Sequence, residues 1–221
     1  MIYPYVRFAI GKPVHHLRIH RMRSWGCRQV LRFSGWRLRC HRDLRHFDGP
    51  RIFVSNHTSV LDIVVGLALI RDEVHYVGKA ELADIPLFGI YFKNMDIPVK
   101  REGFEGRKKM MARAEEDLRE GKHVFIFPEG TTSVASPKLL KFKKGAFVLS
   151  KKLGIPIVPI TFVDNWHLFH YDHPEWRRPG VLRIDVADEC LPDEFEDFNE
   201  MKEAAREKIE RTMNKYFDHG S

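Results

Sequence analysis

Short apolar segments that alternate with helix-like segments are the feature that most constrains the fold of this chain. Apolar strands are expected at residues 51–55, 75–77, 96–99, 123–127, 157–163 and 181–187. Helices are expected between or after them, at residues 60–70, 79–94, 104–120, 145–153 and 200–217. Strands that alternate with helices are typical of an α/β fold. We therefore expect a mixed, largely parallel sheet flanked by helices, with an N-terminal basic helical hairpin.

Length and composition agree with an ordinary globular chain. The 221 residues are 43% hydrophobic and 30% charged, which is far from the composition of disordered chains. The three cysteines, Cys27, Cys40 and Cys190, are too few and too scattered for a disulfide framework or a closed zinc site. Their scarcity favours a reducing compartment.

No apolar segment has the length of a membrane span. The longest one, residues 60–70, has 11 residues and contains Asp62, whereas a spanning helix needs about 20 apolar residues. We expect no signal peptide, because Arg7 and Lys12 interrupt any apolar region near the N-terminus. A chain of this kind is either soluble or lies on a membrane surface.

The positive charge is concentrated in residues 1–45. That segment holds 11 Lys and Arg residues and one acid, which gives +10, while the remainder of the chain is −3. We expect residues 1–45 to form a basic helical arm, broken by Gly26 and Gly35, and residues 46–221 to form the α/β domain. Such an arm favours a polyanion, either nucleic acid or an anionic membrane. The bases alternate with residue types found at lipid headgroups: Leu17, Trp25, Phe33 and Trp36. The alternative is a hairpin docked on the core with a solvated basic face.

A histidine follows the first of the expected strands. The sequence N-H-T-S-V-L-D places His57 after the strand and Asp62 five residues later, within the first turn of the expected helix. A carboxylate that holds an imidazole fixes its tautomer and stabilises the imidazolium, as a general base requires. The helix start at residues 58–60 is a candidate source of backbone N–H groups for an oxyanion. The alternative is a capping histidine bonded to the backbone.

Other polar clusters also follow apolar strands, where ligand sites of α/β sheets lie. Lys100 and Arg101 follow one short strand and suit a phosphate, or else form a solvated charge pair. F-P-E-G-T-T-S follows the strand at 123–127, and its Glu129 is a candidate partner for a substrate hydroxyl, with an ordinary turn as the alternative. Gly130 permits close backbone approach, and Thr131 adds a hydroxyl.

Two further features complete the series. The segment 141–144, which includes Lys143, is a cationic loop that enters the helix at Gly145, and it is another possible anion site. V-P-I places Pro159 in a strand, which indicates an edge position or a bulge.

In this order, H-x-x-x-x-D, the strand-end arginine, F-P-E-G-T, the cationic loop and V-P-I resemble the glycerolipid acyltransferase family over residues 50–165. The resemblance is closest to the 1-acylglycerol-3-phosphate acyltransferases. It implies transfer of a fatty acyl group from acyl-CoA or acyl-carrier protein to the free hydroxyl of 1-acylglycerol 3-phosphate, which gives phosphatidic acid. His57 and Asp62 match the family's catalytic dyad, Arg101 its phosphate-binding arginine, Glu129 and Gly130 its acceptor-binding block, and Pro159 its fourth block.

We expect Lys100, Thr131 and Lys143 to contribute to the same substrate site. No metal and no cofactor besides the acyl donor is expected. The expected location is the cytoplasmic face of a membrane, to which the protein attaches peripherally, with a lipid surface and no nucleic acid as partner.

Thr132 departs from the family's F-P-E-G-T-R-S pattern, because it stands where an arginine is usual. This removes a cation from the acceptor pocket, and it leaves open another lyso-lipid, such as a lyso-aminolipid, or glycerol 3-phosphate as acceptor. A nucleic-acid-binding protein, which the basic arm alone would allow, and a lipid-binding relative without activity are the non-enzyme alternatives.

His167, His170 and His173 have a metal-like spacing, but the aromatic residues around them favour a loop at a membrane edge.

Overall fold

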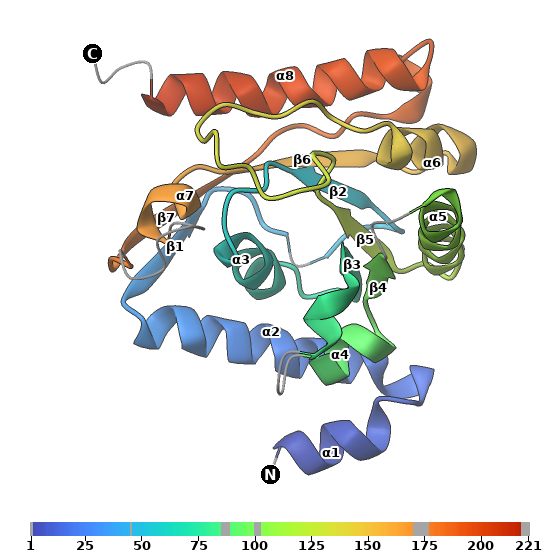
Figure 1. Ribbon diagram of the computed structural model, residues 1–221, viewed down its shortest axis with the longest axis vertical. Coiled ribbons are helices and arrows are strands. Elements are labelled where there is room, and N and C mark those ends of the chain that lie inside the picture. Colours follow the sequence, from blue (N-terminus) through green and yellow to red (C-terminus); the bar gives the residue numbers. More distant parts are fainter. Residues whose placement is uncertain (1, 45, 85–88, 100–102, 170–176, 218–221) are drawn as a thin grey trace.

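The computed structural model describes residues 2–44, 46–84, 89–99, 103–169 and 177–217. Its centre is a seven-stranded sheet in the order β1-β7-β6-β2-β5-β3-β4 (Figure 1). The strands are β1 Trp36–Cys40, β2 Ile52–Ser55, β3 Val74–Lys79, β4 Ile97–Val99, β5 His123–Ile126, β6 Ile157–Phe162 and β7 Gly180–Val186. Every neighbouring pair is parallel except β6 and β7. The expected mixed, largely parallel sheet is therefore confirmed.

Helices cover both faces of the sheet (Figure 1). Helices α2 His16–Phe33 and α3 Leu61–Leu69 pack with one apolar cluster, and α5 Phe104–Arg119, α6 Gly145–Leu153 and α8 Phe198–Phe217 pack with another. The strands between these clusters are apolar on both faces, and every residue of β2, β5 and β6 is buried. Each large side chain buried in this way stabilises the fold by about 1.5–3 kcal/mol. The two-sided core therefore holds the carboxyl ends of the central strands rigidly.

The N-terminal segment differs from the expected pair of short helices. Helix α1 spans Ile2–Ala9, a 3-10 turn η1 spans Pro13–His15, and α2 runs through Gly26 without a break. A glycine inside a helix costs about 1 kcal/mol, but the buried face of α2, including Ile19 and Leu31, holds the helix together. Gly35, with φ of 77°, lies where the chain turns out of α2.

The segment after Gly35 is a strand and not a second helix. Strand β1 pairs in parallel with β7 from Trp36 to Cys40. Helix α2 is also tied to the sheet, because buried Arg23 donates to Asp96 Oδ2 at 2.6 Å. Residues 1–45 thus contribute an edge strand and a docked helix, in addition to the exposed basic face described below.

The remaining elements are short. They are η2 Ala80–Asp84, α4 Gly89–Asn94, α7 Asn165–Leu168 and η4 Pro192–Glu194. Ile160 pairs with Val186, and Ile157 pairs with Cys190 in an isolated bridge. Three residue steps along β6 therefore lie opposite four steps of the neighbouring segment, which is a β-bulge. Pro159 lies at this bulge inside the sheet, so the edge alternative for it is wrong. Among the described residues, no helix combines the length and the apolar character that crossing a membrane requires.

Candidate active site

The carboxyl ends of three adjacent strands bring the polar clusters together. Strand β2 leads into Asn56 and His57, β5 into the segment 127–130, and β6 into Asp164 and Asn165. Because β2 runs parallel to both β5 and β6, these segments leave the sheet at the same edge. This is the edge at which α/β proteins place their ligands.

His57 and Asp62 are in direct contact. The distance between His57 Nδ1 and Asp62 Oδ2 is 2.9 Å. Asp62 lies in the first turn of α3 and is fully buried, whereas 16% of the His57 side chain is exposed. A carboxylate only accepts hydrogen bonds, so Nδ1 of His57 carries the hydrogen and Nε2 keeps its lone pair for another partner. This tautomer is the one that a general base requires.

Asp62 is held by further donors. Its Oδ2 accepts hydrogen bonds from the backbone N–H groups of Thr58 at 2.6 Å and Ser59 at 2.9 Å. Its Oδ1 accepts from Asn165 Nδ2 at 2.8 Å. These donors compensate for burying the carboxylate. The N–H groups of Thr58 and Ser59 are therefore engaged, which corrects the expectation that they stabilise an oxyanion.

The other edge of the His57 ring faces Thr132. The distance from Thr132 Oγ1 to His57 Nε2 is 3.2 Å. The imidazole also stacks on Phe127, with ring centroids 4.0 Å apart and planes inclined by 20°. Asp62, Phe127 and Thr132 together fix the position and plane of the ring, and the partly exposed side chain leaves room for a substrate to approach.

Glu129 is buried beneath the site. Its Oε1 accepts from the backbone N–H of His57 at 2.9 Å, and its Oε2 accepts from that of Leu140 at 2.9 Å. Only 3% of the residue is exposed, and burial raises the pKa of its carboxyl group above the usual range. Each oxygen accepts a backbone hydrogen bond, so in this structure Glu129 positions the His57 segment.

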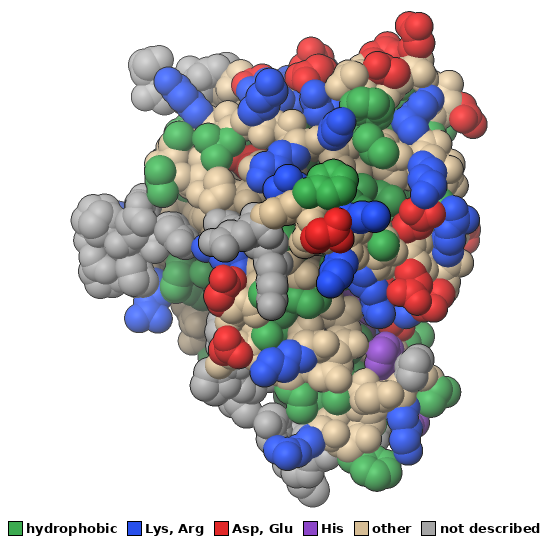
Figure 2. Space-filling view, turned by 45° about the vertical axis from the view of Figure 1, so that its right-hand side comes forward, with side chains coloured by type: hydrophobic (Ala, Val, Ile, Leu, Met, Phe, Trp, Pro, Cys, Tyr) green, Lys and Arg blue, Asp and Glu red, His purple; other side chains and the backbone are tan. Residues whose placement is uncertain are grey.

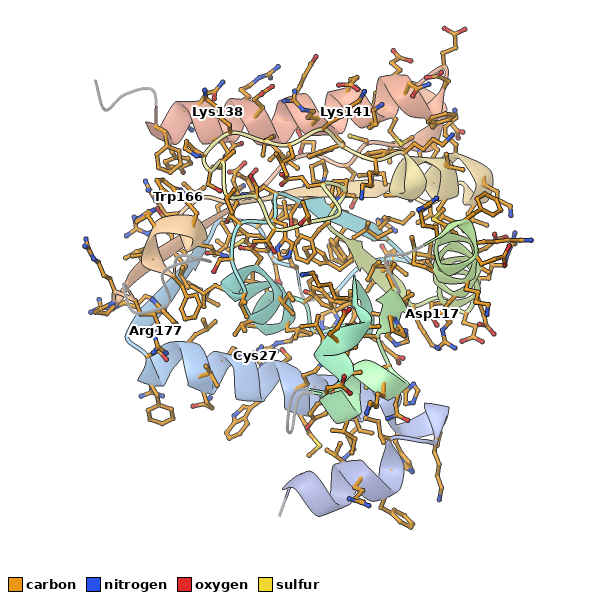
Figure 3. The ribbon with its side chains drawn as sticks, viewed as in Figure 1. Cys27, Asp117, Lys138, Lys141, Trp166 and Arg177 are labelled. Atoms are coloured by element: carbon orange, nitrogen blue, oxygen red, sulfur yellow. The ribbon has the colours of Figure 1, made fainter. Side chains whose placement is uncertain are left out.

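Gly130 and Lys143 form one surface next to Glu129. Gly130 has a φ of 70°, and a Cβ at this position would collide with the Lys143 side chain. The backbone N–H of Lys143 donates to Pro128 O at 2.8 Å, which ties the cationic loop to the turn. Thr131 and Lys143 are both exposed at this surface. Figure 3 shows Lys141 in the same loop, which precedes α6.

The remaining predicted site residues are either buried outside the site or not among the residues that the structure describes. Pro159 is buried within β6, paired with Val54, so it supports the strands that carry the site without lining it. Lys100 and Arg101 fall outside the described residues, as do His170 and His173. His167 lies in α7, 3.8 Å from Asp164 Oδ1, and burial lowers its pKa.

Two asparagines that sequence reasoning missed hold the site together. Asn165 orients Asp62, as described above. Asn56 exchanges two hydrogen bonds with the backbone of Phe162, at 3.0 Å and 2.9 Å, and so joins the end of β2 to that of β6. Asn56 directly follows β2 and Asn165 lies three residues after β6, which was the available signal, but their partners are about 100 positions away in sequence.

Comparisons with known proteins agree with this geometry. The family model for acyltransferases matches residues 37–163. A chloroplastic 1-acyl-sn-glycerol-3-phosphate acyltransferase of Brassica napus is 34% identical over 86% of this chain and 54% of its own length. A putative 1-acyl-sn-glycerol-3-phosphate acyltransferase of Caenorhabditis elegans is 32% identical over 90% of this chain and 77% of its own length.

The fold has a solved counterpart. The crystal structure of the 1-acyl-sn-glycerophosphate acyltransferase PlsC from Thermotoga maritima superposes with a TM-score of 0.82 at 21% identity, over 97% of this chain and 88% of that one. The chain spans about half the length or less of the first three curated relatives it matches. The matched family model covers β2, β5 and β6 together with His57 and Asp62, and the chain belongs to the acyltransferase family.

Proposed function

We propose that the protein transfers a fatty acyl group from a thioester donor to the free hydroxyl of 1-acylglycerol 3-phosphate. The observation that carries this proposal is the Asp62–His57 pair, in which Nδ1 of a partly exposed imidazole contacts the buried carboxylate while Nε2 contacts a neutral hydroxyl. The relatives named 1-acyl-sn-glycerol-3-phosphate acyltransferases support the choice of acceptor.

The chemistry requires one base and no covalent intermediate. The acceptor hydroxyl takes the place of the Thr132 hydroxyl at His57 Nε2, gives its proton to that nitrogen, and attacks the thioester carbonyl. The carbon–sulfur bond then breaks, and the imidazolium returns the proton to the leaving thiolate. Asp62 stabilises the imidazolium through Nδ1. General-base catalysis of this kind typically contributes a factor of about 10²–10⁴.

The acceptor phosphate needs cations near His57. The side chain of Lys143 lies against Gly130, and Gly130 belongs to the same turn as Thr132. The exposed ammonium group of Lys143 suits a phosphate. On the family pattern, Lys100 and Arg101 supply further charge. Acyl-CoA or acyl-carrier protein is the donor in this proposal.

A membrane surface is the proposed location, at its cytoplasmic face. The segment from α1 through η1 to α2 exposes large apolar side chains, among them Phe8, Val14, Trp25, Val30 and Phe33. Exposed bases lie between them, including Arg7, Lys12, Arg18, Arg21 and Arg32. Figure 2 shows hydrophobic and basic side chains intermixed at the lower end of the molecule, where Figure 1 places α1. This combination suits an anionic lipid surface, where the lipid acceptor is found.

The test is an acyl-transfer assay with purified protein, anionic vesicles, a long-chain acyl thioester and lysophosphatidic acid. Conversion is expected with the wild type and should fall by at least about 10²-fold in His57→Ala. His41→Ala, which changes an exposed histidine away from the site, is the matched control. Full activity of His57→Ala would overturn the mechanism.

Thr132 favours one second candidate, transfer to a different lyso-lipid. The position beside His57 Nε2 holds a neutral hydroxyl where relatives of the F-P-E-G-T-R-S pattern carry a cation. Lyso-aminolipids and glycerol 3-phosphate should therefore be assayed in parallel. Transfer to one of these alone, abolished by His57→Ala, would keep the chemistry and change the acceptor. Heparin retention without any acyl transfer would favour the nucleic-acid alternative.

A further inference from the structure

A second buried polar cluster lies at the opposite edge of the sheet from His57. It combines His16 at the start of α2, Glu73 just before β3, and His75 within β3. The distance from Glu73 Oε1 is 3.0 Å to His75 Nε2 and 3.6 Å to His16 Nδ1, and the three atoms all lie within 4.8 Å of one another. His16 and His75 are buried, and Glu73 is half-buried.

The outer nitrogens of both imidazoles are held by acceptors. The distance from His16 Nε2 to the carbonyl oxygen of Ile10 is 2.8 Å, and that from His75 Nδ1 to Asp117 Oδ2 is 2.8 Å. A carbonyl or carboxylate oxygen only accepts, so these two nitrogens carry hydrogens. In neutral imidazoles, the inner nitrogens, His16 Nδ1 and His75 Nε2, are then lone pairs directed at Glu73.

The inner side of the cluster lacks a donor when His75 is neutral, because only a protonated His75 Nε2 can donate to Glu73 Oε1 at 3.0 Å. His16 Nδ1 is fully buried and has no hydrogen-bond partner among the described residues. Its nearest charged neighbour is the Glu73 oxygen, which is itself an acceptor. Buried polar atoms without a partner are rare and costly. Two nitrogen lone pairs and a carboxylate oxygen repel one another when they converge in a buried space. A cation between them would turn this repulsion into attraction.

From this arrangement we propose that His16, Glu73 and His75 bind a divalent transition-metal ion, with Zn²⁺ as the ion that this ligand set fits best. Two imidazoles and one carboxylate are ligands that zinc takes at about 2.0–2.2 Å. Tetrahedral ligands at such lengths lie about 3.3–3.5 Å apart, which is between the two distances measured to Glu73. The contacts of His16 with Ile10 and of His75 with Asp117 are the outer contacts that orient metal-bound imidazoles.

A cavity of about 440 Å³ gives the cluster a route to solvent. Glu73 lines it together with Asp72, Lys122 and His123. A water molecule or an exchangeable ligand can thereby complete the coordination. Asp117, labelled on α5 in Figure 3, is also paired with Arg113 and Lys122. The outer carboxylate is therefore neutralised by its own partners.

The ion would join α2 to the sheet. His16 belongs to the helix that carries the exposed apolar and basic face, whereas Glu73 and His75 belong to the β3 segment. The site is separate from the His57 pair and does not depend on the proposed acyl transfer. No sequence spacing indicates it, because the ligands lie at positions 16, 73 and 75.

The test measures zinc directly. Purified protein is stripped with a chelator, dialysed, titrated with ZnCl₂ by calorimetry, and analysed for bound zinc by mass spectrometry. One Zn²⁺ per chain is expected, with a rise in Tm on zinc addition. Binding should weaken at least 10-fold in His16→Gln and in Glu73→Gln. His46→Gln, which changes an exposed histidine near the cavity, is the matched control and should bind like the wild type.

A variant that fails to fold would also lose zinc binding, so the metal-free wild type is tested as well. It should bind Co²⁺ with the visible absorption of a four-coordinate site, and His57→Ala should bind zinc as the wild type does. Stripped wild-type protein that binds neither ion would overturn the proposal, since a protonated imidazole would then bridge the acceptors. Binding that is undiminished in both His16→Gln and Glu73→Gln would overturn it as well.

Discussion

The hydroxyl of Thr132 lies 3.2 Å from Nε2 of His57, on the ring edge opposite the nitrogen that contacts Asp62. In the proposed reaction, a hydroxyl of the chain thus occupies the position that the acceptor hydroxyl must reach to lose its proton to His57. The acceptor has to displace the Thr132 hydroxyl in this reaction. Thr132, which departs from the family's usual pattern, therefore affects acceptor binding more directly than a distant cation would.

Thr132→Val should lower the KM for the acceptor while kcat stays within about threefold. Valine has nearly the same shape but no hydroxyl, and one neutral hydrogen bond is worth about 0.5–1.5 kcal/mol, so the decrease should be about 2- to 10-fold. Steady-state kinetics over a range of acceptor concentrations measures this. Thr212→Val, which removes a hydroxyl that donates to Asp185 on another part of the fold, is the control. Activity as low as that of His57→Ala would instead mean that the Thr132 hydroxyl takes part in the reaction.

Asn165→Ala should reduce kcat about 10- to 100-fold with little change in the acceptor KM. The amide of Asn165 holds the second oxygen of buried Asp62 at 2.8 Å, and an unsatisfied buried charge costs about 1–3 kcal/mol. Asn199→Ala, on an exposed position of α8, serves as the comparison. An unchanged kcat would exclude a positioning role for Asn165.

Glu129→Gln should lower both stability and kcat. One of the two backbone N–H groups, that of His57 or that of Leu140, would face an amide nitrogen in place of an oxygen acceptor. The free energy of unfolding should fall by about 1–3 kcal/mol, as measured in urea, and the His57 segment should lose its fixed position. Glu120→Gln, at an exposed carboxylate, provides the control. A variant that raises acceptor KM and leaves stability unchanged would show direct substrate contact instead.

Acid should destabilise the fold through His20. Burial lowers the pKa of this imidazole to about 3, and one of its nitrogens lies 3.0 Å from Ile70 O. Because the folded pKa lies below the unfolded value of 6.5, stability is full above pH 6.5. Below pH 6.5, the unfolded state binds a proton at this imidazole and the folded state does not. The free energy of unfolding therefore falls by about 1.4 kcal/mol per pH unit in this range.

The comparison of wild type with His20→Gln isolates this contribution. Urea unfolding at pH 7.5 and 5.5 should show a loss that is about 1.4 kcal/mol larger in the wild type. Equal losses of unfolding free energy in the two proteins would mean that His20 does not cause this pH dependence.

Trp25→Ser combined with Phe33→Ser should weaken binding to anionic vesicles by at least 10-fold. Both side chains are exposed on α2, at 52% and 85%, and burying each in a lipid interface contributes about 1.5–3 kcal/mol. Vesicle sedimentation measures the change. Phe104→Ser, an equally exposed aromatic on α5, is the matched control. Unchanged sedimentation of the double variant would argue against α2 as the membrane-binding face.

The sequence by itself determined the elements whose signals are local. Apolar runs such as 123–127 mark buried strands, and the short separation of His57 and Asp62 across the start of α3 brings their side chains together. The alternation of strands and helices was enough to predict the largely parallel sheet. The order of polar clusters after the strands was enough to predict the acyltransferase family.

Tertiary structure alone decided what depends on partners far along the chain. Helix α2 continues through Gly26 because its buried face packs on the core, and residues 36–40 form a strand because β7 is available to pair with them. Asn165 reaches Asp62, both oxygens of Glu129 reach the backbone, and His16 meets His75 only after the sheet has formed. The physical reason is that long-range packing and hydrogen bonds outweigh local propensities of about 1 kcal/mol or less.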